Sequence, residues 1–593
     1  MISNNNPLKC SPTSGKRKFE AARDPNGIHK SAKLSRNKAA GRHPQPNLGI
    51  SVTGHDGDDE PAWLDLPPGA AERDEYGSEP PMDDDEGRFF GGGITEQESY
   101  VLDYVGDHEE VSTLPDKINA AWLRKTAINF EKRITKNAEA RVKFSDEPPR
   151  FIESEADLDA AIKDFSVLAE HPELYPQFVK LGLVESLVGL LAHDNTDIAI
   201  DVLEIIGELT DEDVYASDAD WDLLADAFLR ADLISLLVSN FSRLNEADET
   251  DRNGVYHALG IIENLISKIE NAEKVCSDTE LLNWLLGRAQ RTETPVTQNK
   301  QYATELLDII ANASPVTRNE LAKQDAADIL LRLVSPYRKS DPEKGSEEEY
   351  MENVFNTLTC IVDEHQGNIK FVEAEGIELC LIMLREGKMS KQPALRLLVH
   401  SVSGDASGAT CQRVVDTGGL KVLFSLFKKA TQHRTIMESL LDMFQSLLRF
   451  LPADSAERIR TLAKFVEKDY EKLERLYALR PFYVSRLSAA DKNIARERSR
   501  MGAPDAELSE GAWYLRRIEE GLYVVRAIDV VLAWLAVEDS GAKRRLRSLL
   551  AKDGFDLTAI EATLLDYRRD IDHDQHEQRD LTGMLTTLID LIL

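Results

Sequence analysis

The chain has 593 residues and carries 104 acidic against 71 basic side chains, a formal charge of −33 at pH 7. This balance disfavours direct nucleic-acid binding and is compatible with basic protein partners or with plain solubility. Five scattered cysteines form no Cys-x-x-Cys pair, so neither a disulfide framework nor a zinc site is indicated. The most apolar stretch, 521–537, contains Arg526 and Asp529, and we expect no membrane-spanning segment.

Residues 1–115 are predicted to be a disordered arm, because they are rich in Pro, Gly, Ser and Asn and lack apolar periodicity. Its charges separate into a basic block, which we place at 16–42, and an acidic block at 56–110. Two basic clusters with a spacer have the layout of a bipartite nuclear localisation signal, and a solvated arm without an address is the alternative. The predicted signal residues are Lys16, Arg17, Lys18, Lys30, Lys33, Arg36 and Lys38.

Order is predicted to begin with a helical cap over 116–170. Residues 118–132 have a helical rhythm of apolar side chains, including Trp122 and Phe130. Pro148-Pro149 ends that segment, because proline lacks the amide donor that a helix needs. From there to the C-terminus the chain is predicted to form successive helices joined by short polar segments.

A recurring helical phrase organises residues 171–452. Each copy has an apolar pair, a tight corner and then an apolar helix, with clear corners at Gly182, Gly376 and Gly418. Weaker corners lie near Ala231, Thr279 and Ala326. Repetition every 43 to 50 residues is typical of stacked helical units that cannot bury their own apolar faces alone. The sequence therefore predicts an all-α fold, an armadillo/HEAT-like α-solenoid (superhelix).

After about residue 452 the phrase stops, and a C-terminal helical domain is predicted over 453–593. We expect long charged helices at 456–479 and 512–537. The first is predicted to face the core with a stripe of apolar side chains. That stripe consists of Ile459, Leu462, Ala463, Val466, Tyr470, Leu473 and Leu476.

The helix predicted over 197–211 carries an unusual row of acids. Asp201, Glu204, Glu208 and Asp211 are spaced by three, four and three residues, which places them in one line along the helix. Like charges at such spacings destabilise a helix by a few tenths of a kcal/mol. The row is either a solvated acidic face or a surface that uses its negative field.

The corresponding helices of later repeats carry more carboxylates and amides. In an α-solenoid the last helix of each repeat lines the concave face, so these side chains would extend the acidic row. Asparagine amides can hold a peptide backbone, and carboxylates can receive Lys or Arg side chains. The predicted peptide-binding residues on these later helices are Glu263, Asn264, Glu305, Asp308, Glu352 and Asn356.

Several ordered phrases from about 117 onward resemble the beta-catenin-like protein 1 family. The first is Leu191 to Ile198, continuing to Glu208-Leu209-Thr210-Asp211, which is similar to the first armadillo repeat of that family. The others are Phe130 to Arg133, Lys143-Phe144, Phe151 to Glu155, Met351 to Asn353, Met383 to Glu386 and Tyr514 to Arg517.

The resemblance implies a nuclear armadillo scaffold of the spliceosome-associated nineteen complex. It implies binding of basic, nuclear-localisation-type segments of splicing factors, foremost the Myb-like scaffold of that complex. It implies no enzyme activity and no cofactor, and it leaves a homodimer open. The alternative is an importin-α-like nuclear transport adaptor, in which successive third helices repeat Trp and Asn. Here the Asn residues occur without a Trp ladder, and no clustered His, Cys or acids indicate a hydrolase or metalloenzyme.

Overall fold

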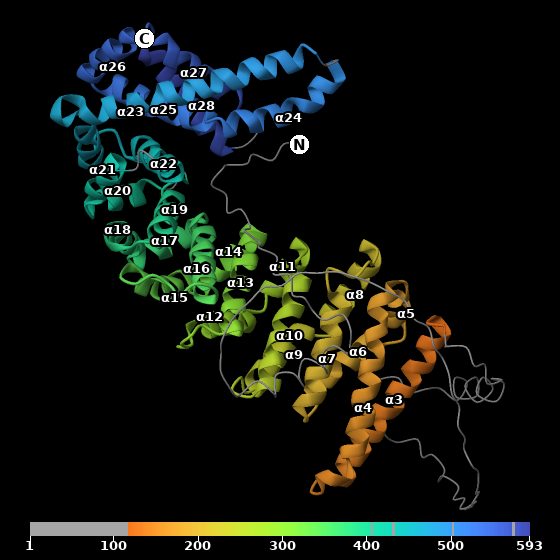
Figure 1. Cartoon of the computed structure of the whole chain (residues 1–593). Helices are drawn as coiled ribbons and strands as arrows, with labels where there is room; N and C mark the ends of the chain where they lie inside the picture. Colours follow the sequence, from red (N-terminus) through yellow and green to blue (C-terminus); the bar gives the residue numbers. More distant parts are fainter. Residues whose placement is uncertain (1–116, 405–406, 430–432, 501–502, 572–575) are drawn as a thin grey trace, which may run out of the picture. The chain divides into compact units, whose positions relative to one another are not determined.

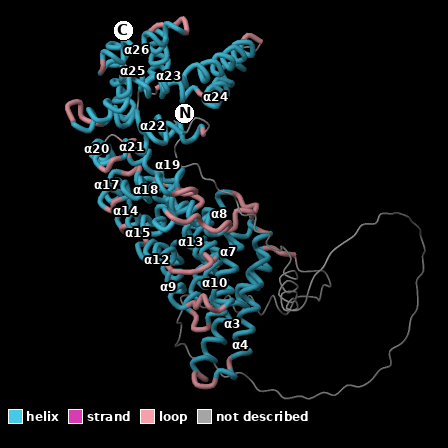
Figure 2. The backbone as a smooth tube through the Cα atoms, turned by 60° about the vertical axis from the view of Figure 1, so that its left-hand side comes forward, coloured by secondary structure: helices cyan, strands magenta, loops and turns pink. Residues whose placement is uncertain are grey.

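The computed structural model describes residues 117–404, 407–429, 433–500, 503–571 and 576–593. In these ranges every long element is a helix and no strand occurs (Figure 2). The predicted arm, 1–115, with its seven signal residues, lies outside the described residues. The all-α solenoid expected from the sequence is confirmed for the part that the structure describes.

The first described helices cover the N-terminal end of the repeats. They are α3 (Ala120–Lys143), η1 (Pro148–Arg150), α4 (Ile152–Lys163), η2 (Asp164–Glu170) and η3 (Pro172–Leu174). The side chain of Asn119 caps α3 by accepting from the amides of Ala121 and Trp122. Phe130 of α3 meets Phe165 of η2 edge to face, with ring centroids 5.0 Å apart. This aromatic contact joins the cap to the first repeat, since Phe165 also packs on Phe178.

Six units of three main helices follow. They are α5 (Tyr175–Lys180), α6 (Leu183–Gly189) and α7 (Thr196–Thr210); α8 (Asp218–Arg230), α9 (Leu233–Arg243) and α10 (Glu249–Ile266); α11 (Ile269–Cys276), α12 (Thr279–Gln290) and α13 (Gln298–Ala313); α14 (Pro315–Lys323), α15 (Ala326–Val334) and α16 (Ser346–Val362); α17 (His365–Glu373), α18 (Gly376–Glu386) and α19 (Lys391–Ser401); α20 (Gly408–Asp416), α21 (Gly419–Lys429) and α22 (Arg434–Phe450). Two short turns, η4 (Leu190–Ala192) and η5 (Ser335–Arg338), follow α6 and α15. Within the described residues, the third helices of successive units pack on one another from α7 to α22 (Figure 1).

The corner between the first two helices of a unit is a left-handed residue in five of the six units. Gly182 and Gly418 have φ of 74° and 82°, and Asp232 and Asp325 have φ of 63° and 54°. In the fifth unit the left-handed residue is Glu375. The corner predicted near Thr279 differs, because Asp278 has φ −79° and instead caps α12 with its carboxylate. A polar cap can therefore replace the left-handed turn in this fold.

Gly376 is needed for a different reason than its predicted corner role. The left-handed backbone belongs to Glu375, one residue earlier. A Cβ at position 376 would lie 2.2 Å from the ring of Phe371, which is fully buried. The glycine therefore allows the start of α18 to close onto the preceding helix, where any side chain would collide with the ring.

The C-terminal helices correct two predicted boundaries. They are α23 (Ala456–Arg498), α24 (Ala503–Glu519), α25 (Leu522–Glu538), α26 (Ser540–Lys552), α27 (Thr558–Arg569) and α28 (His576–Ile592). The helix predicted over 512–537 is divided at Gly521, whose φ is 99° and which faces the ring of Tyr483. The helix predicted over 456–479 is interrupted at Glu467–Tyr470, where three residues are left-handed. The apolar periodicity of the sequence continues across both breaks, because the helices on each side are regular. It therefore predicted one continuous helix in each case.

The predicted apolar stripe of 456–479 is confirmed in its second half and only in part in its first half, where Leu462 packs against the core. Leu473 and Leu476 are fully buried, whereas Ile459 is 60% exposed. The first half instead buries Phe465, together with the polar residues Arg458 and Thr461. The break at 467–470 separates the two halves, so one continuous stripe cannot describe both.

Among the described residues no single helix is both long and apolar enough to cross a membrane. One bent pair, Pro172–Lys180 with Leu183–Ala192, meets those criteria only when its two parts are joined across an 81° bend.

Candidate peptide-binding face

The ten predicted peptide-binding residues all come from the third helices or their ends. We call them the third-helix row: Asp201, Glu204, Glu208, Asp211, Glu263, Asn264, Glu305, Asp308, Glu352 and Asn356. They lie on α7, α10, α13 and α16, which pack successively on one another (Figure 1). The row therefore extends across four repeats. Its members differ in exposure and in what they contact.

On α7 the predicted spacing holds for three of the four acids. Asp201, Glu204 and Glu208 are partly buried at the edge of the helix whose other side is core. Asn195 caps the start of this helix by accepting from the amide of Asp197 through its side chain. Asp211 follows the last helical residue and is exposed, so it lies beyond the row at the start of the next loop.

Asp201 is paired with a lysine from α4, a helix of the N-terminal cap that packs on α7. Lys163 of α4 lies 3.2 Å from the Asp201 carboxylate and also bonds to Asp159. Burial, and to a lesser extent the neighbouring Asp159, raise the pKa of Asp201 to about 7 against the opposing effect of Lys163. The first acid of the row therefore already has a cation from its own chain.

Glu208 and Glu204 contact groups other than Lys or Arg. The hydroxyl of Ser166 donates to Glu208. Burial raises the pKa of Glu208, as do the charges of Glu204 and Asp211. Glu204 acts electrostatically on His257 of α10, whose pKa burial lowers, so this imidazole is mainly neutral at pH 7.

The row residues of α10 link neighbouring repeats. Asn264 donates through Nδ2 to the carbonyl of Gly207 at 3.3 Å and to the hydroxyl of Thr210 at 3.2 Å. Glu263 accepts from the hydroxyl of Tyr302 on α13. These contacts connect α10 to α7, the third helix of the preceding unit, and to α13, the third helix of the following unit.

On α13 and α16 the same pattern continues. Asn356 donates to Asp308 at 3.1 Å, and Asn312 donates to the other carboxylate oxygen at 2.8 Å. Burial raises the pKa of Asp308 to about 6. Glu305 accepts from the amide of Gln301 at 3.0 Å, whereas Glu352 is exposed on the surface of α16.

Arg396 of α19 is a member of this face that the prediction missed. Its guanidinium donates to the side-chain oxygen of Asn356. Successive row positions 264, 308, 356 and 396 are separated by 44, 48 and 40 residues, close to the repeat period. Extending the period by one unit would have pointed to Arg396. Its opposite charge kept it out of a search for acids and amides.

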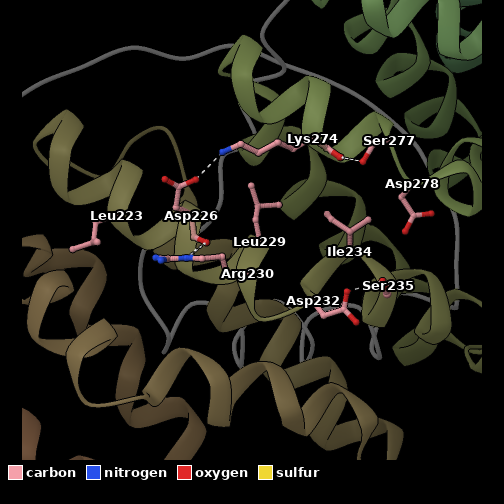
Figure 3. A pocket seen from close by; sticks show the side chains of 10 residues that line it. All are labelled: Leu223, Asp226, Leu229, Arg230, Asp232, Ile234, Ser235, Lys274, Ser277 and Asp278. Carbon is pink, nitrogen blue, oxygen red and sulfur yellow. Dashed lines mark hydrogen bonds and ion pairs between the residues drawn. The ribbon is translucent and has the colours of Figure 1, made fainter.

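A hollow on other helices is lined partly by charged side chains that pair with one another. It lies between α8, α9, α11 and α12 (Figure 3). Lys274 donates to Asp226 at 2.8 Å, and Ser235 donates to Asp232 at 2.9 Å. Leu229 and Ile234 also line it, so the hollow has an apolar part. No sequence-predicted site residue lies there.

The described residues contain neither a metal site nor a reactive cysteine. No group of three or more His, Cys, Asp and Glu there could hold a metal ion. Cys276, Cys360, Cys380 and Cys411 are buried and form no disulfide among the described residues. Burial raises the pKa of Cys276 and Cys411 to about 12, which keeps these thiols protonated and unreactive.

Comparison with known proteins identifies the family. Residues 99–565 match a family described as "Catenin-beta-like, Arm-motif containing nuclear". The beta-catenin-like protein 1 homolog of Schizosaccharomyces pombe is 38% identical over 506 residues, which covers 84% of this chain and 87% of the relative. Human beta-catenin-like protein 1 is 33% identical over 490 residues, covering 79% and 86% respectively. The resemblance seen in the sequence is confirmed, and the chain belongs to the catenin-beta-like family of Arm-motif-containing nuclear proteins.

Proposed function

We propose that the surface of the third helices that carries the third-helix row binds basic, extended segments of partner proteins. We call this surface the third-helix face. We also propose that the chain is a non-enzymatic scaffold. The observation that carries this is the run of carboxylates over stacked third helices, with Glu204, Glu208 and Glu305 partly exposed along it. A carboxylate at a partly desolvated surface receives Lys or Arg through charge-assisted hydrogen bonds. An extended segment crossing the helices would meet two of these carboxylates on α7 and one on α13.

We further propose which proteins supply these basic segments. The family description as nuclear and the resemblance in sequence support splicing factors of the nineteen complex, among them its Myb-like scaffold, as the source of the basic segments. A transport adaptor of the importin-α type is less well supported. The third helices α7, α10, α13, α16, α19 and α22 contain no tryptophan.

The test is a calorimetric titration with a basic splicing-factor peptide at two salt concentrations. We expect binding to weaken as salt rises, because screening acts beyond about 8 Å at physiological ionic strength. Neutralising the row by Glu204→Gln, Glu208→Gln and Glu305→Gln should weaken binding about tenfold, a loss of about 1.4 kcal/mol.

A matched control changes the same net charge elsewhere. Glu185, Glu373 and Glu386 are exposed and lie on first or second helices. Their joint replacement by Gln should leave the affinity within about twofold, apart from a weak long-range effect. Equal losses in the two triple variants would show that net charge, and not the third-helix face, attracts the peptide.

Nuclear entry is a separate proposal that rests on the arm. The basic residues Lys16 to Lys38 precede the part of the chain, 99–565, that matches a family described as nuclear. Replacing all seven signal residues by Ala should shift a tagged protein toward the cytoplasm in fluorescence images. Unchanged nuclear accumulation would remove the arm as the main address.

A further inference from the structure

Arg396 places a guanidinium group at the C-terminal end of the third-helix row. It donates to the side-chain oxygen of Asn356, whose amide in turn donates to Asp308. The charge of Arg396 also lowers the pKa of Asp308, against the larger effect of burial. Nε of Arg396 is buried and makes no hydrogen bond within the described structure. The guanidinium is therefore held in the row by only part of its donor set.

Lys163 occupies the other end in a similar way. Its ammonium group lies between Asp159 and Asp201, at 3.2 Å from the latter. Lys163 comes from α4, which packs on α7, just as Arg396 comes from α19, which packs on α16. The first and last helices of the row thus each receive one cation from the adjacent helix outside it.

The carboxylates between these two ends are held differently. Glu208 accepts from a serine hydroxyl, and Glu305 accepts from a glutamine amide. In the described structure neither they nor Glu204 form an ion pair with a lysine or arginine. Hydroxyl and amide donors satisfy hydrogen bonds without cancelling charge, so the net negative potential is centred on α7 and α13.

We propose that Arg396, and more weakly Lys163, are resident cations that take the end positions of the row and confine a partner's basic side chains to Glu204, Glu208 and Glu305. This rests on the proposed function and deepens it by naming the ligand as a short Lys/Arg cluster. Arg396 acts by excluding a further cation from the Asn356–Asp308 pair. It is a specificity-determining residue, with no direct contact to the partner required.

The helix spacing sets the length of that cluster. Packed helices lie about 8–10 Å apart, so α7 to α13 spans roughly 16–20 Å. An extended chain advances about 3.3 Å per residue, which gives a footprint of about five or six residues. Without Arg396 the face would extend over α16 and α19 and would accept a cluster nearly twice as long.

Arg396 should limit binding more than Lys163. The Lys163 side chain is 52% exposed, and such a surface pair contributes at most about 1 kcal/mol. Its flexible stem can also move aside when a ligand arrives. Arg396 is half-buried between packed helices, and its charge cannot leave without breaking the bond to Asn356.

The test uses the full chain and two fluorescent peptides of equal length, about twelve residues. One is basic throughout, and the other has about six central basic residues flanked by Gly and Ser. Arg396→Gln removes the resident charge. Arg332→Gln is the matched control, because Arg332 is 73% exposed and lies on α15, a second helix that carries no residue of the row. Fluorescence anisotropy gives the affinities.

We expect Arg396→Gln to strengthen binding of the fully basic peptide by about tenfold and of the centrally basic peptide by less than about threefold. Arg332→Gln should change neither by more than about twofold. Arg396→Lys keeps the cation and should behave as the wild type. Arg396→Met keeps the aliphatic stem and replaces the Gln variant if that variant does not fold.

The outcomes separate this inference from the proposed function. If the wild type binds neither peptide, both fall. If it binds them but Arg396→Gln and Arg332→Gln give the same gain, only net charge matters and the resident-cation inference alone is overturned. Weaker binding by Arg396→Gln also overturns it, since Arg396 would then support the face and not limit it.

Discussion

Two regions of the molecule use buried carboxylates in opposite ways. In the C-terminal helices Asp529 is fully buried, and Arg480 donates to both of its oxygens at 2.7 and 3.0 Å. Arg526 likewise donates to Asp566 at 2.8 Å and bonds to Asp570. In the third-helix row, Asp201 and Asp308 have a cation of the chain nearby, whereas Glu208 and Glu305 accept from a serine hydroxyl and a glutamine amide.

The difference distinguishes structural acids from acids available to a ligand. A buried ion pair with matched geometry is complete, because each charge is neutralised where water is absent. A partly buried carboxylate with only neutral donors keeps its charge and its field, at a cost in stability. The carboxylates of the C-terminal helices are therefore neutralised within ion pairs, whereas the partly buried carboxylates of the row keep a negative field.

The largest expected effect breaks the C-terminal pair. Arg480→Ala should destabilise the protein by about 3–5 kcal/mol, because it leaves the Asp529 carboxylate buried and alone. Urea denaturation followed by circular dichroism measures the loss. The double variant Arg480→Met with Asp529→Leu should recover most of it. A single variant as stable as the wild type would contradict the view of this pair as a closed structural unit.

A carboxyl between the two regions sharpens the comparison. Asp442 on α22 is 7% exposed, and its Oδ2 atom makes no hydrogen bond within the described residues. Burial raises its pKa well above the usual value, with Glu438 adding to the effect. The folded state therefore holds a proton that the unfolded chain releases, and stability falls as pH rises above the unfolded value.

Asp442→Asn should consequently stabilise the protein at pH 8 by about 2 kcal/mol and much less at pH 4. Unfolding midpoints in urea at the two pH values give the difference. Ser439→Ala, a change one turn earlier on the same helix, is the control and should show no such pH dependence. A variant that is less stable at pH 8 would mean that Asp442 has an ionic role.

Asp201 tests the same dependence of folding stability on pH, here within the third-helix row. Its pKa is about 7 in the folded protein and 3.8 as an ordinary Asp, so the folded state binds more protons between these values. Stability should therefore decrease as pH rises from about 4 to 7. Asp201→Asn imitates the protonated form, and its stability relative to wild type should grow by about 1 kcal/mol from pH 5 to pH 8. A constant difference in urea midpoints would argue against a raised pKa of Asp201 in the folded protein.

The smallest expected effect concerns the links between repeats. Asn264→Ala removes hydrogen bonds from α10 to α7 and should cost about 0.5–1 kcal/mol. Asn283→Ala on α12 is the matched change at an exposed site, and it should stay within about 0.5 kcal/mol of wild type. Equal effects of the two changes in thermal denaturation would mean that the row contributes nothing to repeat coupling.

The repeat period and the helical pattern were enough to predict the all-α solenoid. Each unit has an apolar face that only its neighbours can cover. The spacing of apolar residues within each helix is enough to identify that face. The side chains of Asn195 and Ser314 cap α7 and α14, and such a cap is also local because it involves residues within one turn. The breaks at Gly521 and at 467–470 were missed, because the helices on each side continue the same periodicity.

The sequence by itself determined which side chains lie along one edge of a third helix, because a helix fixes the direction of residues three and four apart. Only the tertiary structure decided what each of them contacts. Lys163 reaches Asp201 and Arg396 reaches Asn356 from helices that are separated by about 40 residues. The charge state and burial of a carboxylate depend on such distant neighbours. An Asp or Glu is therefore neutralised by an ion pair in one place and keeps its negative charge in another.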